Sequence, residues 1–215
     1  MPARAPEGGQ QFFQFFHINF LFSEKAGYPA LKIYIDQGHN PENPNSGAEG
    51  NGFREQDLVY EIGQQTAARL RGMGFDVRLS RPTAQTQLGT SVATSLAARV
   101  NDANDWGADY FISLHANSSE IAAASGTEAF VYRRDSAAED LADDLVLRVT
   151  EATGLADRGV FARPGLYVLR KTRMPAVLLE LGFITNRRDA DLMAYSPGLF
   201  AAGIANGFLT YLRSN

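Results

Sequence analysis

Two of the three histidines in this 215-residue sequence stand just past the carboxyl ends of predicted buried strands. His39 follows the apolar segment LKIYID at residues 31–36, and His115 follows DYFISL at residues 109–114. Ligands of open α/β sheets gather at the carboxyl ends of the strands. We therefore expect the two imidazoles to meet at one edge of a sheet, although they are far apart in the chain.

Glu180 ends a third apolar segment, PAVLLE at residues 175–180, and is expected at the same edge. A carboxylate that follows four apolar residues is costly to bury without a partner. We interpret Glu180 as an acid/base group of an active site. The alternative is a structural glutamate paired with an arginine such as Arg99 or Arg187.

A second carboxylate is expected to join the histidines from a helix. Glu55, Val59, Ile62 and Thr66 follow the spacing i, i+4, i+7 and i+11, which places them on one helical face. Because Val59 and Ile62 should face the sheet, Glu55 should point inward from the first turn. The alternative is an acid favoured there only by the helix dipole.

These residue types indicate metal chemistry. The chain contains no cysteine, so any metal must be held by histidine and carboxylate. Two histidines and a glutamate, here His39, His115 and Glu55, form a common catalytic zinc set with one open position. Zinc lowers the pKa of bound water to about 7, and Glu180 would accept the proton of that water and pass it to a leaving amine. Such a set can also hold other divalent ions.

The surrounding sequence alternates strands with helices. We predict six strands, at residues 31–36, 75–80, 109–114, 127–133, 166–169 and 176–181. We predict four helices, at residues 54–71, 90–106, 136–153 and 197–212. This order predicts a three-layer α/β sandwich, with a mostly parallel mixed sheet of about six strands flanked by helices. The strand at 127–133 is expected to be an edge or antiparallel addition.

The composition sets limits on partners. Hydrophobic residues make up 45% and charged residues 20%, which is typical of a globular protein. The net charge is −4 and no basic stripe is visible, so we expect no nucleic-acid partner. No apolar run reaches about 18 residues, so we expect no transmembrane segment.

We divide the chain into an N-terminal extension, residues 1–30, and a catalytic domain, residues 31–215. The aromatic stretch QFFQFFHINFLF at 11–22 lacks the basic start and smooth apolar run of a secretory signal. We therefore interpret residues 1–30 as an extension that packs on the domain or stays loose.

From Leu31 to Leu212 the sequence resembles the catalytic domain of zinc-dependent bacterial N-acetylmuramoyl-L-alanine amidases. The motifs that carry the resemblance are IYIDQGHN (33–40), FREQDLV (53–59), AARVNDAN (97–104), ADYFISLHAN (108–117), SGTEAFVY (125–132) and PAVLLELGFITN (175–186). The resemblance implies zinc (Zn2+) ligands at His39, Glu55 and His115 and a catalytic glutamate at Glu180. It also implies hydrolysis of the amide between the lactyl group of N-acetylmuramic acid and L-alanine of the peptidoglycan stem peptide, outside the cell or in its envelope.

The sequence departs from the family in two loops. The loop after the first strand reads GHNPENPNSGAEGNGF, where many members have GHGG. Some members carry a long insertion with a zinc-blocking helix after the second histidine, but only residues 116–125 are available here. We therefore predict an open site.

Other polar residues are candidate neighbours of this site. Asn40 and Asn117, close to the two histidines, and Glu128 are candidate substrate contacts, although Glu128 could equally be a solvated strand residue. Arg99 is expected to be a buried guanidinium that ties its helix to loop carbonyls or to a carboxylate.

Two alternative functions remain open at this point. The first is another zinc hydrolase on the same framework, such as a deacetylase or a carboxypeptidase, for which Arg163, Arg170 or Arg173 would bind a terminal carboxylate. The second is a non-catalytic module that binds the cell wall. Retention of all four chemical residues argues against the second alternative.

Overall fold

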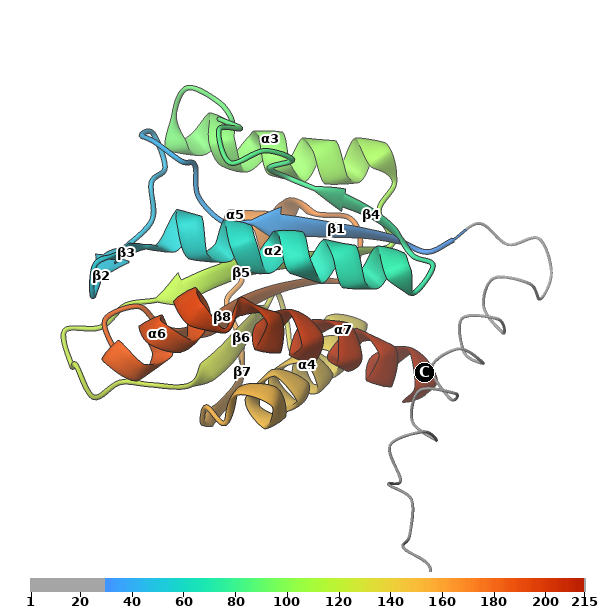
Figure 1. The fold of residues 1–215 in the computed structure, drawn as a ribbon. Coiled ribbons are helices and arrows are strands. Elements are labelled where there is room, and N and C mark those ends of the chain that lie inside the picture. Colours follow the sequence, from blue (N-terminus) through green and yellow to red (C-terminus); the bar gives the residue numbers. More distant parts are fainter. Residues whose placement is uncertain (1–29, 215) are drawn as a thin grey trace, which may run out of the picture.

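The fold was analysed in a computed structural model that describes residues 30–214. Its centre is a six-stranded mixed sheet with the strand order β4-β1-β5-β8-β6-β7 (Figure 1). The strands are β1 (Lys32–Gln37), β4 (Asp76–Leu79), β5 (Tyr110–Asn117), β6 (Thr127–Val131), β7 (Asp157–Ala162) and β8 (Ala176–Phe183). The first four strands in the order are parallel, whereas β6 is antiparallel to β8 and parallel to β7. The predicted three-layer α/β sandwich is confirmed.

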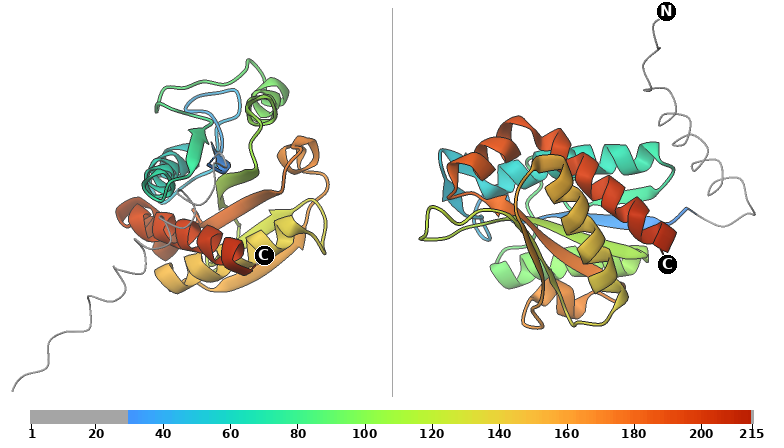
Figure 2. Two further views of the ribbon diagram at one scale, coloured as in Figure 1. Left: turned by 90° about the vertical axis from the view of Figure 1, so that its right-hand side faces the viewer. Right: turned by 90° about the horizontal axis from the view of Figure 1, so that it is seen from below.

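Helices cover both faces of this sheet (Figures 1 and 2). Helices α2 (Glu55–Gly72), α4 (Ala137–Thr153) and α7 (Pro197–Ser214) pack on one face, and α3 (Val92–Trp106) and α5 (Tyr167–Lys171) lie on the other. Helix α6 (Arg187–Tyr195) and the hairpin of β2 (Glu49–Gly50) and β3 (Phe53–Arg54) lie toward the carboxyl ends of the parallel strands.

Strand β1 shows why its sequence forms an interior strand. Ile33 and Ile35 belong to the core under α2, α4 and α7, whereas Tyr34 belongs to the core under α3 and α5. A parallel strand covered on both faces is apolar on both faces. After Lys32, charged and amide side chains appear only at the end of the strand, at Asp36 and Gln37, which is the edge that carries the candidate site.

Helix ends follow local capping signals. Ser91 caps α3 in a capping box with Thr94, and the helix ends at Gly107, whose φ of 69° suits glycine. Ser136 caps α4, which ends in the same way at Gly154. These signals explain why the predicted helix bounds agree with the structure within about two residues.

One predicted strand is wrong. Residues 166–169 form the start of helix α5, because a turn at 163–166 is closed by the Leu166 amide donating to the Arg163 carbonyl. The Arg170 amide then donates to the Leu166 carbonyl, which begins a helix. The alternation of Leu, Tyr and Val resembles a strand, but the turn overrides it.

The sixth strand is instead β7, which begins with Asp157, Arg158 and Gly159 and therefore resembles a turn in the sequence. The prediction for 127–133 is confirmed in direction, since β6 is antiparallel to β8. The edge position is wrong, because β7 pairs with the other side of β6.

The predicted extension at 1–30, including the aromatic stretch at 11–22, lies outside the described residues except for Ala30. Within residues 30–214, no single helix has the length and hydropathy to cross a membrane. The pair α6 and α7, bent by 83°, meets the length and composition criteria only when the two helices are taken together.

Candidate metal centre

His39 is held at the end of β1 by backbone contacts. The Gly38 amide donates to the Leu114 carbonyl at 3.0 Å, and His39 itself has a φ of 63°. A non-glycine residue in this region is strained unless its surroundings hold it, and here Arg99 donates to the His39 carbonyl. A Cβ on Gly38 would lie 2.5 Å from Cε1 of His115, so glycine is required for the close approach of that ring.

Glu55 joins the two histidines from the first turn of α2. Its Oε1 lies 3.1 Å from Nε2 of His39 and 3.0 Å from Nδ1 of His115, and it accepts a hydrogen bond from the Ala116 amide. Its Oε2 accepts from the Ala48 amide at 2.9 Å. Burial opposes its ionisation, yet hydrogen bonds from His115 and His39 hold the pKa of Glu55 well below its usual range. The predicted inward direction of Glu55 is confirmed.

The three side chains fit a divalent metal. One ligand atom from each lies within 4.8 Å of the others, and no other histidine or acid of residues 30–214 belongs to this group. The donor set of two imidazoles and one ionised carboxylate is one that catalytic zinc uses. Both histidines direct a nitrogen to the same carboxylate oxygen, Oε1 of Glu55, so the donors converge on one point.

Glu180 lies next to this cluster through strand register. It pairs with His115 on β5 and with Glu128 on β6, so the three side chains form one row across the sheet. Burial, followed by the charges of Glu55 and Glu128, raises the pKa of Glu180 to about 8.

The alternative that Glu180 is a structural ion-pair partner is wrong. Its Oε2 is buried and has no hydrogen-bond partner among the described residues. Arg99 pairs with Asp36, and Arg187 pairs with Asp191. Glu180 is therefore a half-buried acid with one buried carboxylate oxygen and with no cationic partner among the described residues.

Two of the candidate substrate contacts lie beside Glu180. Glu128 is only 8% exposed, and its carboxylate accepts from Nδ2 of Asn117 at 2.9 Å and from Nε of Arg158 at 2.8 Å. The interpretation of Glu128 as a solvated strand residue is therefore wrong. Arg158 was not identified from the sequence, because β7 was not predicted.

Asn40 is placed differently. It is fully buried, its Nδ2 donates to the Pro44 and Leu88 carbonyls, and its Oδ1 accepts from the Leu88 amide. These bonds hold the loop after β1 against the loop before α3. Asn40 therefore shapes the rim through the backbone, and its amide is not free to contact a substrate.

The predicted structural role of Arg99 is confirmed. The side chain is 1% exposed and donates from one nitrogen to Oδ1 of Asp36 at 2.5 Å and to the Gln37 carbonyl at 2.6 Å. Ser113 donates to the other oxygen of Asp36. This buried network supports the end of β1 from which His39 projects.

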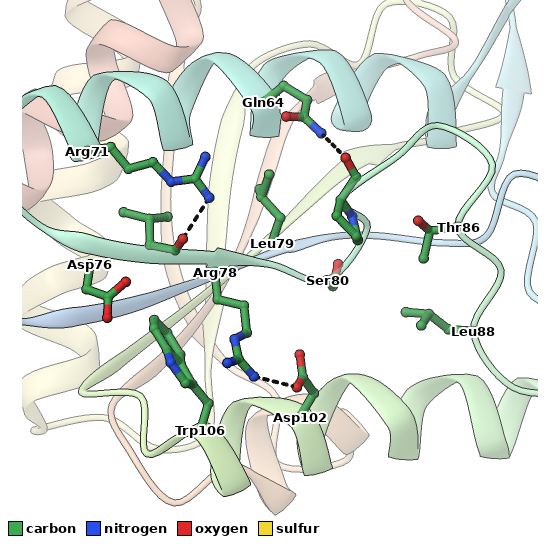
Figure 3. A pocket seen from close by; sticks show the side chains of 12 residues that line it. Gln64, Arg71, Asp76, Arg78, Leu79, Ser80, Thr86, Leu88, Asp102 and Trp106 are labelled. Carbon is green, nitrogen blue, oxygen red and sulfur yellow. Dashed lines mark hydrogen bonds and ion pairs between the residues drawn. The ribbon is translucent and has the colours of Figure 1, made fainter.

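Two hollows differ in their relation to the cluster. A small cavity of about 130 Å3 has His39 and His115 in its wall and continues toward α5. A larger hollow of about 640 Å3 lies along the edge strand β4 and α3 (Figure 3). In that hollow Arg78 pairs with Asp102 and Arg71 donates to the Val77 carbonyl, so these cations already have partners.

The fold and the site define a class. A mixed α/β sheet whose carboxyl edge brings together two histidines and a glutamate, with a half-buried glutamate beside them, offers the donor set and the acid that metal-dependent hydrolases use. The family model described as N-acetylmuramoyl-L-alanine amidase matches residues 33–210. The chain belongs to this amidase family.

Individual relatives agree with this assignment. The chain is 36% identical over 189 residues to the N-acetylmuramoyl-L-alanine amidase CwlM of Bacillus licheniformis, covering 82% of this chain and 67% of that one. The catalytic domain of the amidase CwlV from Bacillus (Paenibacillus) polymyxa superposes with a TM-score of 0.74 at 32% identity, covering 86% and 99%. The amidase AmiC2 of Nostoc punctiforme gives 0.75 at 31% identity, covering 87% and 99%.

Proposed function

We propose that residues 31–215 form a zinc-dependent catalytic domain that cleaves the amide between the N-acetylmuramic acid lactyl group and L-alanine of the stem peptide. The observation that carries this proposal is the convergence of His39, Glu55 and His115 with Glu180 paired beside them. Membership of the amidase family supports the choice of bond.

The metal ligands in this proposal are His39, Glu55 and His115. Bound zinc supplies Lewis acidity, which polarises a carbonyl oxygen and acidifies water. Glu55 is suited to a cation because its lowered pKa keeps it ionised at neutral pH. Its second oxygen, bonded to the Ala48 amide, fixes the direction of the carboxylate.

Glu180 moves the proton. As a base, its carboxylate takes a proton from the attacking water, and as an acid it gives that proton to the nitrogen of the departing L-alanine. A general acid/base works best when its pKa lies near the working pH. Burial brings Glu180 to that range, and the absence of a cationic partner among the described side chains leaves its carboxyl free to exchange the proton.

Peptidoglycan is the partner in this proposal, and the site of action is the cell envelope or the space outside it. The relatives are named as amidases of this bond, and the charge pattern gives no reason to add a nucleic-acid partner. The carboxypeptidase alternative gains no support from Arg163. Its amide bonds the Val131 carbonyl at the opposite end of β6 from Glu128, which lies in the Glu180 row.

Digestion of purified peptidoglycan tests the proposal. The zinc-loaded protein should release material with new L-alanine amino ends and new lactyl carboxyl ends, and chelation should stop the release until zinc is restored. Freed terminal amino acids would instead indicate a carboxypeptidase, and freed acetate a deacetylase. Wall binding without any new ends would indicate a binding module.

A further inference from the structure

The small cavity beside the imidazoles has an apolar far wall. Its apolar lining comes from three elements: Leu96 on α3, Leu166 and Val168 at the start of α5, and Leu178 on β8; Tyr167 also lines it. Leu178 precedes Glu180 by two residues on one strand, so both side chains lie on the same face of the sheet. The cavity therefore adjoins both the imidazoles and the strand position that carries the acid.

We infer that this cavity is a subsite for the methyl group next to the scissile amide, an inference that rests on the proposed function. The carbons on either side of that amide, the lactyl carbon and the Cα of L-alanine, each carry one methyl group. Either methyl group is thus a small aliphatic branch on a carbon that is bonded directly to the reacting amide.

The polar groups of the wall bond mainly to one another and to the backbone, although Nε of Arg99 and Nδ1 of His39 are buried without a hydrogen-bond partner among the described residues. Both carboxylate oxygens of Asp36 are bonded, one to Arg99 and one to Ser113. Arg99 also donates to the Gln37 and His39 carbonyls, and Nδ2 of Asn45 donates to Oγ of Ser95. A polar branch entering the cavity would exchange its hydration for a wall whose exposed surface is mostly apolar, which disfavours it relative to a methyl group.

The size of the cavity also selects a small group. A volume of about 130 Å3 is slightly below the ~150 Å3 of a cavity that holds a benzene ring, so it accommodates a short aliphatic branch but not a long side chain. Leu166 limits this volume from a fixed position, because its amide is held by the Arg163 carbonyl and its carbonyl accepts from the Arg170 amide. The turn before α5 thus sets the depth of the cavity.

Substrate analogues test the inference on the wild-type protein. Three soluble muramyl-peptides are compared with the natural one: a glycolyl analogue without the lactyl methyl, a glycine analogue without the alanine methyl, and an analogue with 2-aminobutyrate in place of alanine. Losing a group from an apolar pocket costs roughly ten-fold or more in kcat/KM. We expect such a loss for one of the first two analogues and little change for the other, which identifies the methyl group bound.

Enlarging the cavity supplies a second test. Leu166→Ala should raise kcat/KM for a substrate with an ethyl branch at the identified position, relative to the natural substrate, by about ten-fold. Leu147→Ala, which truncates an exposed leucine on α4, is the matched control and should leave the ratio unchanged. A ratio between two substrates is independent of the fraction of folded enzyme.

The outcomes separate the two proposals. Hydrolysis at the lactyl amide with equal rates for all analogues would overturn the subsite and leave the amidase proposal standing. An unchanged ratio in Leu166→Ala would overturn the subsite as well. Absence of hydrolysis of every substrate by the zinc-loaded protein would overturn both.

Discussion

Glu128 and Glu180 occupy directly paired positions on the antiparallel strands β6 and β8, yet only Glu128 has a cationic partner, Arg158. Glu180 has no such partner among the described residues, and its Oε2 is buried and unbonded. Burial and the neighbouring charges of Glu55 and Glu128 therefore raise the pKa of Glu180 to about 8. The same pairing keeps a second carboxylate, bonded to Arg158, beside Glu180.

Replacing the acid tests its catalytic role. Glu180→Gln keeps the size of the side chain but cannot move a proton, so we expect kcat to fall about 10²- to 10⁴-fold while one zinc per chain is retained. Turnover on a soluble muramyl-peptide and metal analysis of the same sample measure the two effects. A variant with zinc and a nearly normal rate would remove Glu180 from this role.

The raised pKa has a consequence for stability in the metal-free protein. Between its ordinary value of 4.5 and its folded value of about 8, the folded state binds more protons at Glu180 than the unfolded state does. The free energy of unfolding therefore falls as pH rises through this window, by at most about 1.4 kcal/mol per pH unit. Relative to Glu180→Gln, the wild type should lose stability between pH 5 and pH 8.

Urea unfolding of both proteins in the presence of chelator, at several pH values, gives this difference. Comparing the two proteins cancels the contributions of the other titrating groups. Stability curves that run parallel across the window would show that Glu180 is not buried as a neutral acid.

Removing one of the metal ligands should make the melting temperature of the protein independent of zinc. We expect His115→Ala to lose zinc, because it removes one of three ligands, and to melt at the same temperature with and without chelator. The wild type should melt at a lower temperature after chelation, since an ion that binds only the folded state stabilises it. Thermal melts with and without chelator provide the measurement, and a zinc-dependent melt in His115→Ala would argue against the assignment.

The buried ion pair of Arg99 and Asp36 supports the end of β1 that carries His39, and we expect the protein to lose stability when the pair is broken. Breaking a buried pair by removing one partner costs about 3–5 kcal/mol, so we expect Arg99→Met to lower the free energy of unfolding by that amount. Arg78→Met breaks the exposed pair with Asp102 and should cost about 1 kcal/mol or less. Equal losses in urea unfolding of the two variants would contradict the structural role of Arg99.

The sequence was sufficient to predict the convergence of these side chains because each of them carries a local signal. His39, His115 and Glu180 follow apolar strands, and parallel strands bring their carboxyl ends to one edge. Glu55 shares a helical face with Val59 and Ile62, all of which are buried. Periodicity therefore predicted the direction of each side chain.

The surroundings of the cluster could not be predicted because they depend on pairings between distant segments. Arg158 reaches Glu128 only through the β6–β7 pairing, and β7 begins with residues typical of a turn. The engagement of Asn40 depends on the Leu88 loop, which no periodic pattern describes. The position of Leu166 follows from one turn hydrogen bond that outweighs the strand-like alternation after it.

The central claim is that His39, Glu55 and His115 hold one ion beside Glu180. Anomalous diffraction at the zinc edge from crystals of the zinc-loaded protein tests it most directly. We expect a single anomalous peak about 2.0–2.2 Å from one atom of each ligand, with no side chain of the protein in the fourth position and with Glu180 beside it. A peak elsewhere, or one that lacks any of the three ligands, would contradict the account.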